Sequence, residues 1–362
     1  MRLSSLGLGL CLALGLVACS SSGGTSSGGA SSGSSGTDSS SGASSGGVKG
    51  PAISAGTFIY TRRVKPDVHH LVARDLATGN ERLVTDLTSD GSQGWSISGF
   101  SISPDRTQIV LASIYGPTKE DNDTQLATNR IWLLDTEGKS FKRLTPVFKN
   151  TNLGTSGFRI DVRTPVFSKD GATVYYQYGE MVIGKSGASR TWSVPVDGSK
   201  LPDLLDTPSA CSAASPPSVN PATGDVVLAQ DFCQDKADAG LVVFKADGQK
   251  PEMLVQGEGF GTSSVRWALD GSLFIYTFAT GGLSSLNAYV LEKKQSVQLV
   301  QPPSGASIDS AALSPDGNFI VYCVRQGAFV DGTRNLRLLD LSKEPITDEA
   351  ITTDGVSCDP EF

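Results

Sequence analysis

A turn motif that recurs along the chain constrains the fold more than any other feature of the sequence. It reads Ser-Pro-Asp-Gly at Ser314–Gly317 and takes related forms at four earlier places. These are Ser103–Arg106, Ser168–Gly171, Asn220–Gly224 and Leu269–Gly271. The last residues of successive turns are 65, 53, 47 and 46 positions apart. A period near 46 residues, with insertions early in the chain, is typical of a β-propeller.

The chemistry of each turn predicts a strand after it. Proline presets φ, aspartate can bond to its own backbone, and glycine tolerates the positive φ at which the chain reverses. The runs that follow the turns are rich in Val, Ile, Tyr and Phe, which favour strands. They are Thr107–Ser113, Thr173–Tyr178, Asp225–Gln230, Ser272–Phe278 and Asn318–Val324. A second series of predicted strands comprises Leu71–Asp75, Ile131–Asp135, Thr191–Val194, Leu241–Phe244, Ala288–Leu291 and Leu336–Asp340, followed by short last strands such as Arg143–Thr145 and Met253–Val255.

The two ends of the chain are predicted to complete one blade together. The second series has six strands, whereas there are only five turns. Phe58–Thr61 has the composition of a strand that follows a turn, and Asp359–Phe362 parallels Thr164–Phe167, which precedes one. If these two segments match, the next turn glycine would fall 49 residues after Gly317, in keeping with the period. We therefore predict an all-β, six-bladed propeller whose N- and C-terminal strands share a blade, so that no sheet edge stays open there.

These repeats resemble the TolB-type, or PD40 "WD40-like", propeller family. Units of that family run as an aromatic residue, then Ser-Pro-Asp-Gly, then an apolar strand. The resemblance covers residues 54–362 and is strongest at Ser314–Tyr322 and Ser101–Leu111. TolB also has an N-terminal α/β domain, whereas this chain has only a Ser/Gly-rich segment in that position. The resemblance therefore implies the fold, but not the specific partners of TolB.

The N-terminal segment predicts export and lipid anchoring. Arg2 precedes the apolar run Leu6–Val17, which is too short to cross a hydrocarbon core of ~30 Å and is typical of a signal peptide. The sequence Leu16-Val17-Ala18-Cys19 resembles the lipobox of bacterial lipoproteins, so Cys19 is the predicted lipidation site. Residues 20–50 are almost entirely Ser and Gly and are expected to form a disordered tether with a reach of roughly 30 Å.

We therefore predict a signal peptide at residues 1–18, the lipidated Cys19 and tether at residues 19–50, and the propeller at residues 51–362. Ser20 and Ser21 carry no acidic retention signal, so we expect the outer membrane, facing the periplasm or the cell surface. Without the signal, 29 Lys and Arg stand against 37 Asp and Glu, a net charge of −8 that disfavours nucleic-acid binding. Membrane association is then expected through the lipid anchor and not through a basic patch.

Four cysteines remain after Cys11 leaves with the signal and Cys19 is lipidated: Cys211, Cys233, Cys323 and Cys358. An even number in an exported chain is compatible with two disulfides, which four cysteines can form in three ways. If the turn Asn220–Asp225 centres a hairpin, facing positions sum to about 445, so Cys233 lies almost opposite Cys211. Cys323 and Cys358 would then pair between the last blade and the closing strand. The alternative is four buried free thiols.

Motifs for catalysis or metal binding have little support in the sequence. Two matches to Gly-x-Ser-x-Gly, at Gly24–Gly28 and Gly29–Gly33, fall in the tether, where the strand-turn-helix context of a nucleophile is missing. The adjacent His69 and His70 would point to opposite faces of a strand. Glu120–Asp123 lacks the ligand spacing of a calcium loop. We therefore expect no catalytic, cofactor or metal residues and no cofactor.

Loop lengths indicate where a partner would bind. The connections Tyr115–Asn129 and Pro146–Val162 are the longest on the face that carries the links between blades, and long loops on a rigid scaffold usually serve recognition. The partner-face candidates are Tyr115, Glu120, Asp121, Asp123, Phe148 and Lys149. We expect a monomeric, non-catalytic envelope lipoprotein whose propeller binds a protein or glycan through this face and the channel mouth. The alternatives are a lyase or hydrolase with a site in the channel, or a structural envelope component.

Overall fold

A computed structural model describes residues 48–65, 68–85, 96–114, 129–146, 158–182, 189–200, 203–204, 211–213, 215–231, 233, 235–257, 265–280, 283–328 and 331–362. Residues 45–362 form one compact unit. The signal peptide, Cys19 and all but the last residues of the tether lie outside the described residues, so those predictions stay predictions. Among the described residues, no helix is both long and apolar enough to cross a membrane.

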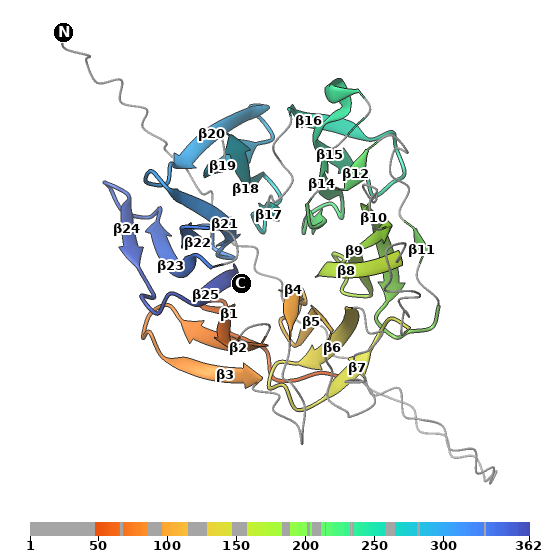
Figure 1. Ribbon diagram of the computed structural model, residues 1–362, viewed down its shortest axis with the longest axis horizontal. Coiled ribbons are helices and arrows are strands. Elements are labelled where there is room, and N and C mark those ends of the chain that lie inside the picture. Colours follow the sequence, from red (N-terminus) through yellow and green to blue (C-terminus); the bar gives the residue numbers. More distant parts are fainter. Residues whose placement is uncertain are drawn as a thin grey trace, which may run out of the picture. The chain divides into compact units, whose positions relative to one another are not determined.

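Six antiparallel sheets stand around a central axis, which confirms the six-bladed, all-β fold (Figure 1). Blade 1 contains β25 (Ser357–Glu361), β1 (Thr57–Lys65), β2 (Val68–Asp75) and β3 (Glu81–Thr85); blade 2 contains β4 (Ile97–Ile102), β5 (Gln108–Ser113), β6 (Arg130–Asp135) and β7 (Phe141–Arg143); blade 3 contains β8 (Phe158–Phe167), β9 (Thr173–Val182), β10 (Ser189–Pro195) and β11 (Asp203–Leu204).

Blade 4 contains β12 (Ser212–Ala213), β13 (Ser218–Val219), β14 (Val226–Asp231), β15 (Gly240–Phe244) and β16 (Glu252–Gln256); blade 5 contains β17 (Val265–Trp267), β18 (Leu273–Thr280), β19 (Leu283–Val290) and β20 (Gln295–Val300); blade 6 contains β21 (Ala306–Leu313), β22 (Phe319–Gln326), β23 (Thr333–Asp340) and β24 (Thr347–Ala350). A single turn of 3-10 helix, Lys236–Asp238, links β14 to β15. The strand predicted at Arg143–Thr145 lies two residues earlier in the structure, where β7 ends at Arg143. Thr145 is outside the strand, and its hydroxyl accepts a hydrogen bond from the Ile131 backbone.

The closing blade has the composition predicted from the chain ends. β25 is its innermost strand and pairs antiparallel with β1, with Thr61 opposite Cys358 and Arg62 opposite Ser357. The C-terminus accordingly lies beside β1 on the inner side of the ring (Figure 1). The match between Asp359–Phe362 and Thr164–Phe167 extends to the backbone, since Asp359 and Thr164 have φ of 48° and 47°.

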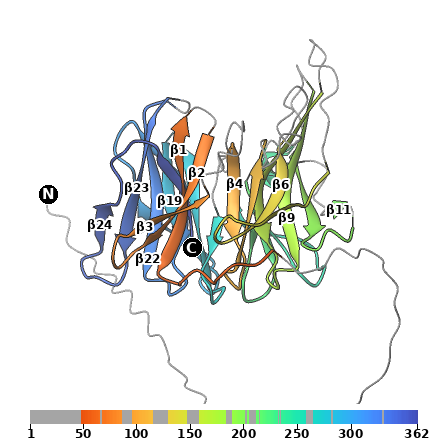
Figure 2. The same cartoon turned by 90° about the horizontal axis from the view of Figure 1, so that it is seen from below.

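The core lies between neighbouring blades, as the second strand of blade 2 shows. All six residues of β5 are buried. Successive side chains of a strand point to opposite faces. Ile109 and Leu111 therefore pack with residues of blade 1, whereas Val110 and Ala112 pack with residues of blade 3. The same blade-to-blade packing recurs around the ring, and Figure 2 shows the strands of adjacent blades standing side by side.

Two disulfides join the four cysteines in the predicted pairs. Cys211 and Cys233 bracket the hairpin of blade 4, with their Cα atoms 4.1 Å apart. Facing positions sum to 445 at Ser218 and Val227, but the register slips by two residues at Ser212, which faces Asp231. Cys323 of β22 and Cys358 of β25 have their Cα atoms 5.1 Å apart and join blade 6 to the closing strand.

The chain enters the propeller along blade 2. Lys49, which the sequence assigns to the tether, forms an ion pair with Asp105, and the Gly50 N–H donates to the carbonyl of Thr107. A Cβ at Gly50 would come within 2.5 Å of the Thr136 hydroxyl, so only glycine fits this close approach. We call Val48–Thr57 the entry segment; it is held against the β4–β5 turn.

Candidate functional site

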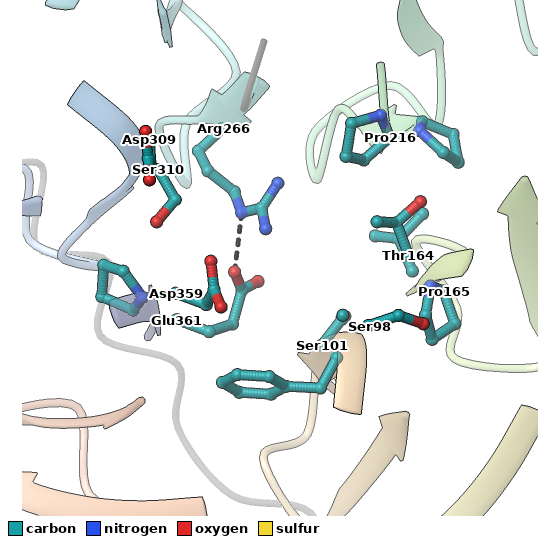
Figure 3. Close-up of a pocket in the computed structure, with 15 residues that line it drawn as sticks. Ser98, Ser101, Thr164, Pro165, Pro216, Arg266, Asp309, Ser310, Asp359 and Glu361 are labelled. Carbon is teal, nitrogen blue, oxygen red and sulfur yellow. Dashed lines mark hydrogen bonds and ion pairs between the residues drawn. The ribbon is translucent and has the colours of Figure 1, made fainter. Parts of the chain in front are cut away.

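A cavity of about 140 Å³ lies on the central axis, and every blade contributes to its wall (Figure 3). Its lining comprises Ser98, Gly99, Phe100 and Ser101 of β4, Thr164, Pro165 and Val166 of β8, Pro216 and Pro217 of blade 4, Arg266 of β17, Asp309 and Ser310 of β21, and Asp359, Pro360 and Glu361 of β25. All except the blade 4 prolines come from the innermost strands. A central channel lined by all blades is where a propeller can surround a ligand group.

An irregular backbone orients some of these side chains toward the cavity. The inner strands β8 and β25 change register next to Thr164 and Asp359, and both residues have a positive φ. A left-handed conformation is rare for a β-branched residue and costs about 1–3 kcal/mol. Only four non-glycine residues in the described part of the chain have a positive φ, and two of them line this cavity. Bulges and strained residues of this kind gather at functional sites.

The approach of blades 2 and 3 depends on a glycine in this wall. Gly99 has a φ of 146°, and a Cβ there would lie 2.8 Å from the Cα of Thr164. The strained Thr164 is thus packed against the backbone of the next blade. Its hydroxyl donates to the Gln177 side chain at 3.1 Å, which fixes the orientation of the threonine.

An ion pair spans the cavity between blades 5 and 1. Arg266 Nε lies 2.6 Å from Glu361 Oε2, as the dashed line in Figure 3 shows. The two residues occupy the same position relative to their turns as Ser101 and Val166, so this position faces the axis in four blades. Burial raises the pKa of the Glu361 carboxyl, and Arg266 opposes part of that rise.

A second carboxylate of the wall is held from behind by two arginines. Arg325 Nε donates to both oxygens of Asp309 at 3.0 Å, and Arg334 Nε lies 3.2 Å from Oδ2. Burial raises the pKa of Asp309, and the two guanidinium groups counteract it. Asp309, Cys323 and Cys358 form the metal-like cluster found in the described part of the chain. Because both sulfurs are in a disulfide, they cannot act as thiolate ligands.

The cavity wall has two chemically different halves. Blades 5, 6 and 1 supply the charged residues Arg266, Asp309, Asp359 and Glu361. Blades 2, 3 and 4 supply serine, threonine and apolar residues, including three prolines. In Figure 3 the labelled charged groups lie on one side of the cavity, with Thr164, Pro165 and Pro216 opposite them.

The residues singled out from the sequence lie elsewhere. The partner-face candidates Tyr115, Glu120, Asp121, Asp123, Phe148 and Lys149 are outside the described residues, as are the two Gly-x-Ser-x-Gly matches. His69 and His70 are on β2 and do not line the cavity. His69 Nδ1 accepts a hydrogen bond from the Ile97 backbone at 3.3 Å.

The charged residues of the channel were missed by sequence reasoning. A signal was present, because Arg266 and Glu361 are charged at the position five residues before the turn glycine or its expected place, where other repeats have Ser101 and Val166.

Comparisons with known proteins identify the fold. No family model matches the sequence, and no curated protein matches it. TolB from Acinetobacter baumannii aligns with a TM-score of 0.58 at 16% identity, covering 84% of this chain and 66% of that one. The putative TolB from Agrobacterium tumefaciens aligns with a TM-score of 0.55 at 13% identity, covering 84% and 91%. This chain has a TolB-like propeller fold.

The TolB-like fold also occurs within proteins of other kinds. Hydrazine synthase of Kuenenia stuttgartiensis aligns with a TM-score of 0.57 at 13% identity over 86% of this chain and 47% of that one. The present chain spans just under two thirds of the Acinetobacter TolB. At such identities the similarity concerns the fold, so function has to be argued from the channel itself.

Proposed function

We propose that this TolB-like propeller is a lipid-anchored, non-catalytic protein of the cell envelope that binds a protein or glycan partner at the mouth of its central channel. The observation that carries the proposal is the cavity to which all six blades contribute, with a charged half facing an uncharged half. Such a wall suits a group that presents polar atoms on one side and apolar surface on the other.

The ion pairs formed by two of the channel carboxylates support binding over catalysis. Glu361 is paired with Arg266, and Asp309 with two arginines. A catalytic acid or base must exchange a proton with the reacting group, and an ion-paired carboxylate is poorly placed to do so. Asp359 receives a hydrogen bond from Thr61 at 3.0 Å but remains exposed, and is therefore the carboxylate most accessible to a partner.

A capture experiment with a matched control tests the binding proposal. The full chain is immobilised and exposed to solubilised envelope proteins and glycans of the source bacterium, and bound material is identified by mass spectrometry. Asp359→Arg reverses one charge in the cavity wall, whereas Glu292→Arg makes the same change at an exposed turn away from it. The wild type and E292R should retain the same partner and D359R should lose it. Equal retention by all three proteins would place the binding surface outside the channel.

Anchoring is tested separately at Cys19. Metabolic labelling with a fatty acid should acylate the wild type and leave Cys19→Ala unlabelled, because the thiol carries the first lipid. Acyl chains on C19A would disprove anchoring at this residue, and cell fractionation of the labelled protein would decide between the inner and outer membranes. Several acyl chains on one residue would give the stable attachment that a single chain does not.

A further inference from the structure

The outer edge of blade 5 differs from the outer edges of the other blades. Within the described part of the chain, the outermost strand of each blade is paired on one side only. Natural proteins protect such edges with charge, proline, bulges or short length. β3 contains Glu81 and Arg82, β7 contains Lys142 and Arg143, β16 contains Glu252, and β24 contains Asp348 and Glu349. β11 has only two residues.

β20 lacks most of these protections. It has six residues, Gln-Ser-Val-Gln-Leu-Val, and is the longest of the outermost strands. It contains no charged residue, no proline and no glycine, which is the composition that favours strand pairing between chains. Its first four residues are exposed, and the Val297 side chain is 45% accessible. Its only bulge falls near its end, where the pairing with β19 shifts between Leu286 and Asn287. Among the described residues, β20 pairs with β19 alone.

We propose that β20 pairs antiparallel with β20 of a second copy of this chain, across a two-fold axis near Val297. Such an interface is isologous, as in most homodimers. With the axis at Val297, Ser296 would face Gln298 and Gln295 would face Leu299 of the other copy. Valine would then meet valine at the centre, and backbone groups at the exposed edge would gain partners.

Charge explains why a second copy can be accommodated at this edge. The mature chain is acidic, so two copies repel one another over most of their surface. β20 itself is neutral, and the nearest charges before it include Lys293 and Lys294 of the preceding turn. In the proposed register these lysines fall opposite the far end of the other strand, so they do not face each other. Self-pairing of β7 or β24 would instead bring like charges together.

The inference is independent of the proposed channel function. The repeats alone predict a monomer, because in a closed ring every blade packs between two other blades. They say nothing of the outer edges, where β20 lies.

Introduction of a charge at the centre of the interface tests the proposal. The full-length protein in detergent is examined by light scattering and sedimentation over a range of concentrations. The wild type should dimerise, and Val297→Lys and Val297→Glu should each weaken the dimer about tenfold or more, because like charges would meet at the axis. Mixing V297K with V297E should restore dimers, since the two residues are then opposite in sign.

Matched controls separate dimer loss from misfolding. Leu83→Lys places the same charge at another exposed position on an outermost strand, β3, and should leave the dimer unchanged. Thermal melting should show that all variants remain folded. A wild type that stays monomeric at every concentration, a dimer that persists in V297K, or a mixture that stays monomeric would each overturn the proposal.

Discussion

At the scale of residues, the repeated turn is stabilised by a small set of hydrogen bonds. In blade 6 the Ser314 hydroxyl donates to Asp316 Oδ1 at 2.5 Å and accepts from the Phe319 backbone at 2.9 Å. The Asn318 N–H donates to the same carboxylate oxygen. The turns of blades 2 and 3 repeat this pattern. Serine, aspartate and a residue with positive φ therefore each have a defined role in these three turns, and this is why the motif could be recognised in the sequence.

Arg106 departs from this pattern in an informative way. It occupies the glycine position of its turn with a φ of 57°, where the other four turns have glycine. Its guanidinium donates to the carbonyls of Ile53, Ser54 and Thr57 at 2.7–2.8 Å, and burial lowers its pKa. The strained residue thus fixes the entry segment through these three hydrogen bonds.

Two substitutions at Arg106 separate the effect of its hydrogen bonds from the effect of its strained φ. Arg106→Ala loses the three hydrogen bonds and keeps the strained φ, so it should destabilise the propeller by about 2–4 kcal/mol. Arg106→Gly loses the same bonds but relieves the strain, so it should be about 1 kcal/mol more stable than R106A. Urea unfolding gives the stabilities, and faster amide exchange in Val48–Thr57 of both variants would report release of the segment. Equal stability of R106A and the wild type would contradict the assigned role.

At the scale of elements, the closing strand carries interactions out of proportion to its length. The phenyl ring of Phe362 packs 5.7 Å from that of Phe58, and Thr61 donates to the Cys358 carbonyl. Arg62 reaches Asp354, just before β25, while also contacting Glu81. β25 thus joins the C-terminal end of the chain to β1 and, through the Cys358 disulfide, to blade 6.

Deletion of Asp359–Phe362 should lower the melting temperature much more than loss of a surface tail, because it exposes the inner edge of β1 and the core beneath Phe58. At about 2–4 °C per kcal/mol for a domain of this class, a loss of several kcal/mol should be plain in calorimetry. Glu292→Ala removes only an exposed side chain away from the closing strand and serves as the control. An unchanged melting temperature after the deletion would show that closure does not depend on β25.

The disulfides give the second prediction at this scale. Non-reducing peptide mapping of the exported protein should recover Cys211 linked to Cys233 and Cys323 linked to Cys358. Loss of either pair by double substitution with alanine should cost about 2–4 kcal/mol, because each constrains the unfolded chain. Four alkylatable thiols, or a link between Cys211 and Cys358, would contradict the pairing.

The strands could be predicted from the sequence and the channel could not, for a physical reason. The strands follow from turn chemistry and apolar runs, which are local features of the sequence. The closing blade follows from the count and spacing of these repeats. Blade 4 already shows the limit, because Pro216 and Pro217 split its inner edge into two short strands, β12 and β13. The orientation of the Thr164 and Asp359 side chains depends on a positive φ that such residues rarely adopt. It also depends on the packing of Gly99 against the next blade. Those features exist only once the ring has formed.

At the scale of the whole molecule, carboxylates of two kinds are distributed around the ring. Those in the turns, including Asp105, Asp170 and Asp316, accept hydrogen bonds that hold each pKa below its usual value of 3.8. Those of the channel, Asp309 and Glu361, have a pKa raised by burial. The two groups therefore respond to acid in opposite directions.

The opposite pKa shifts of Asp316 and Glu361 can be tested with one variant of each residue. A lowered pKa means that the folded chain binds the proton more weakly, so the stability supplied by Asp316 is present above its unfolded pKa and is lost as the pH falls through the folded value. The advantage of the wild type over Asp316→Asn should therefore shrink below about pH 4. For Glu361 the folded pKa is raised, so the wild type should gain stability relative to Glu361→Gln as the pH falls from neutral toward the unfolded value of 4.5. Urea unfolding of the three proteins between about pH 3 and 7 measures both trends. Trends of the same sign in the two variants would show that burial does not dominate the Glu361 site.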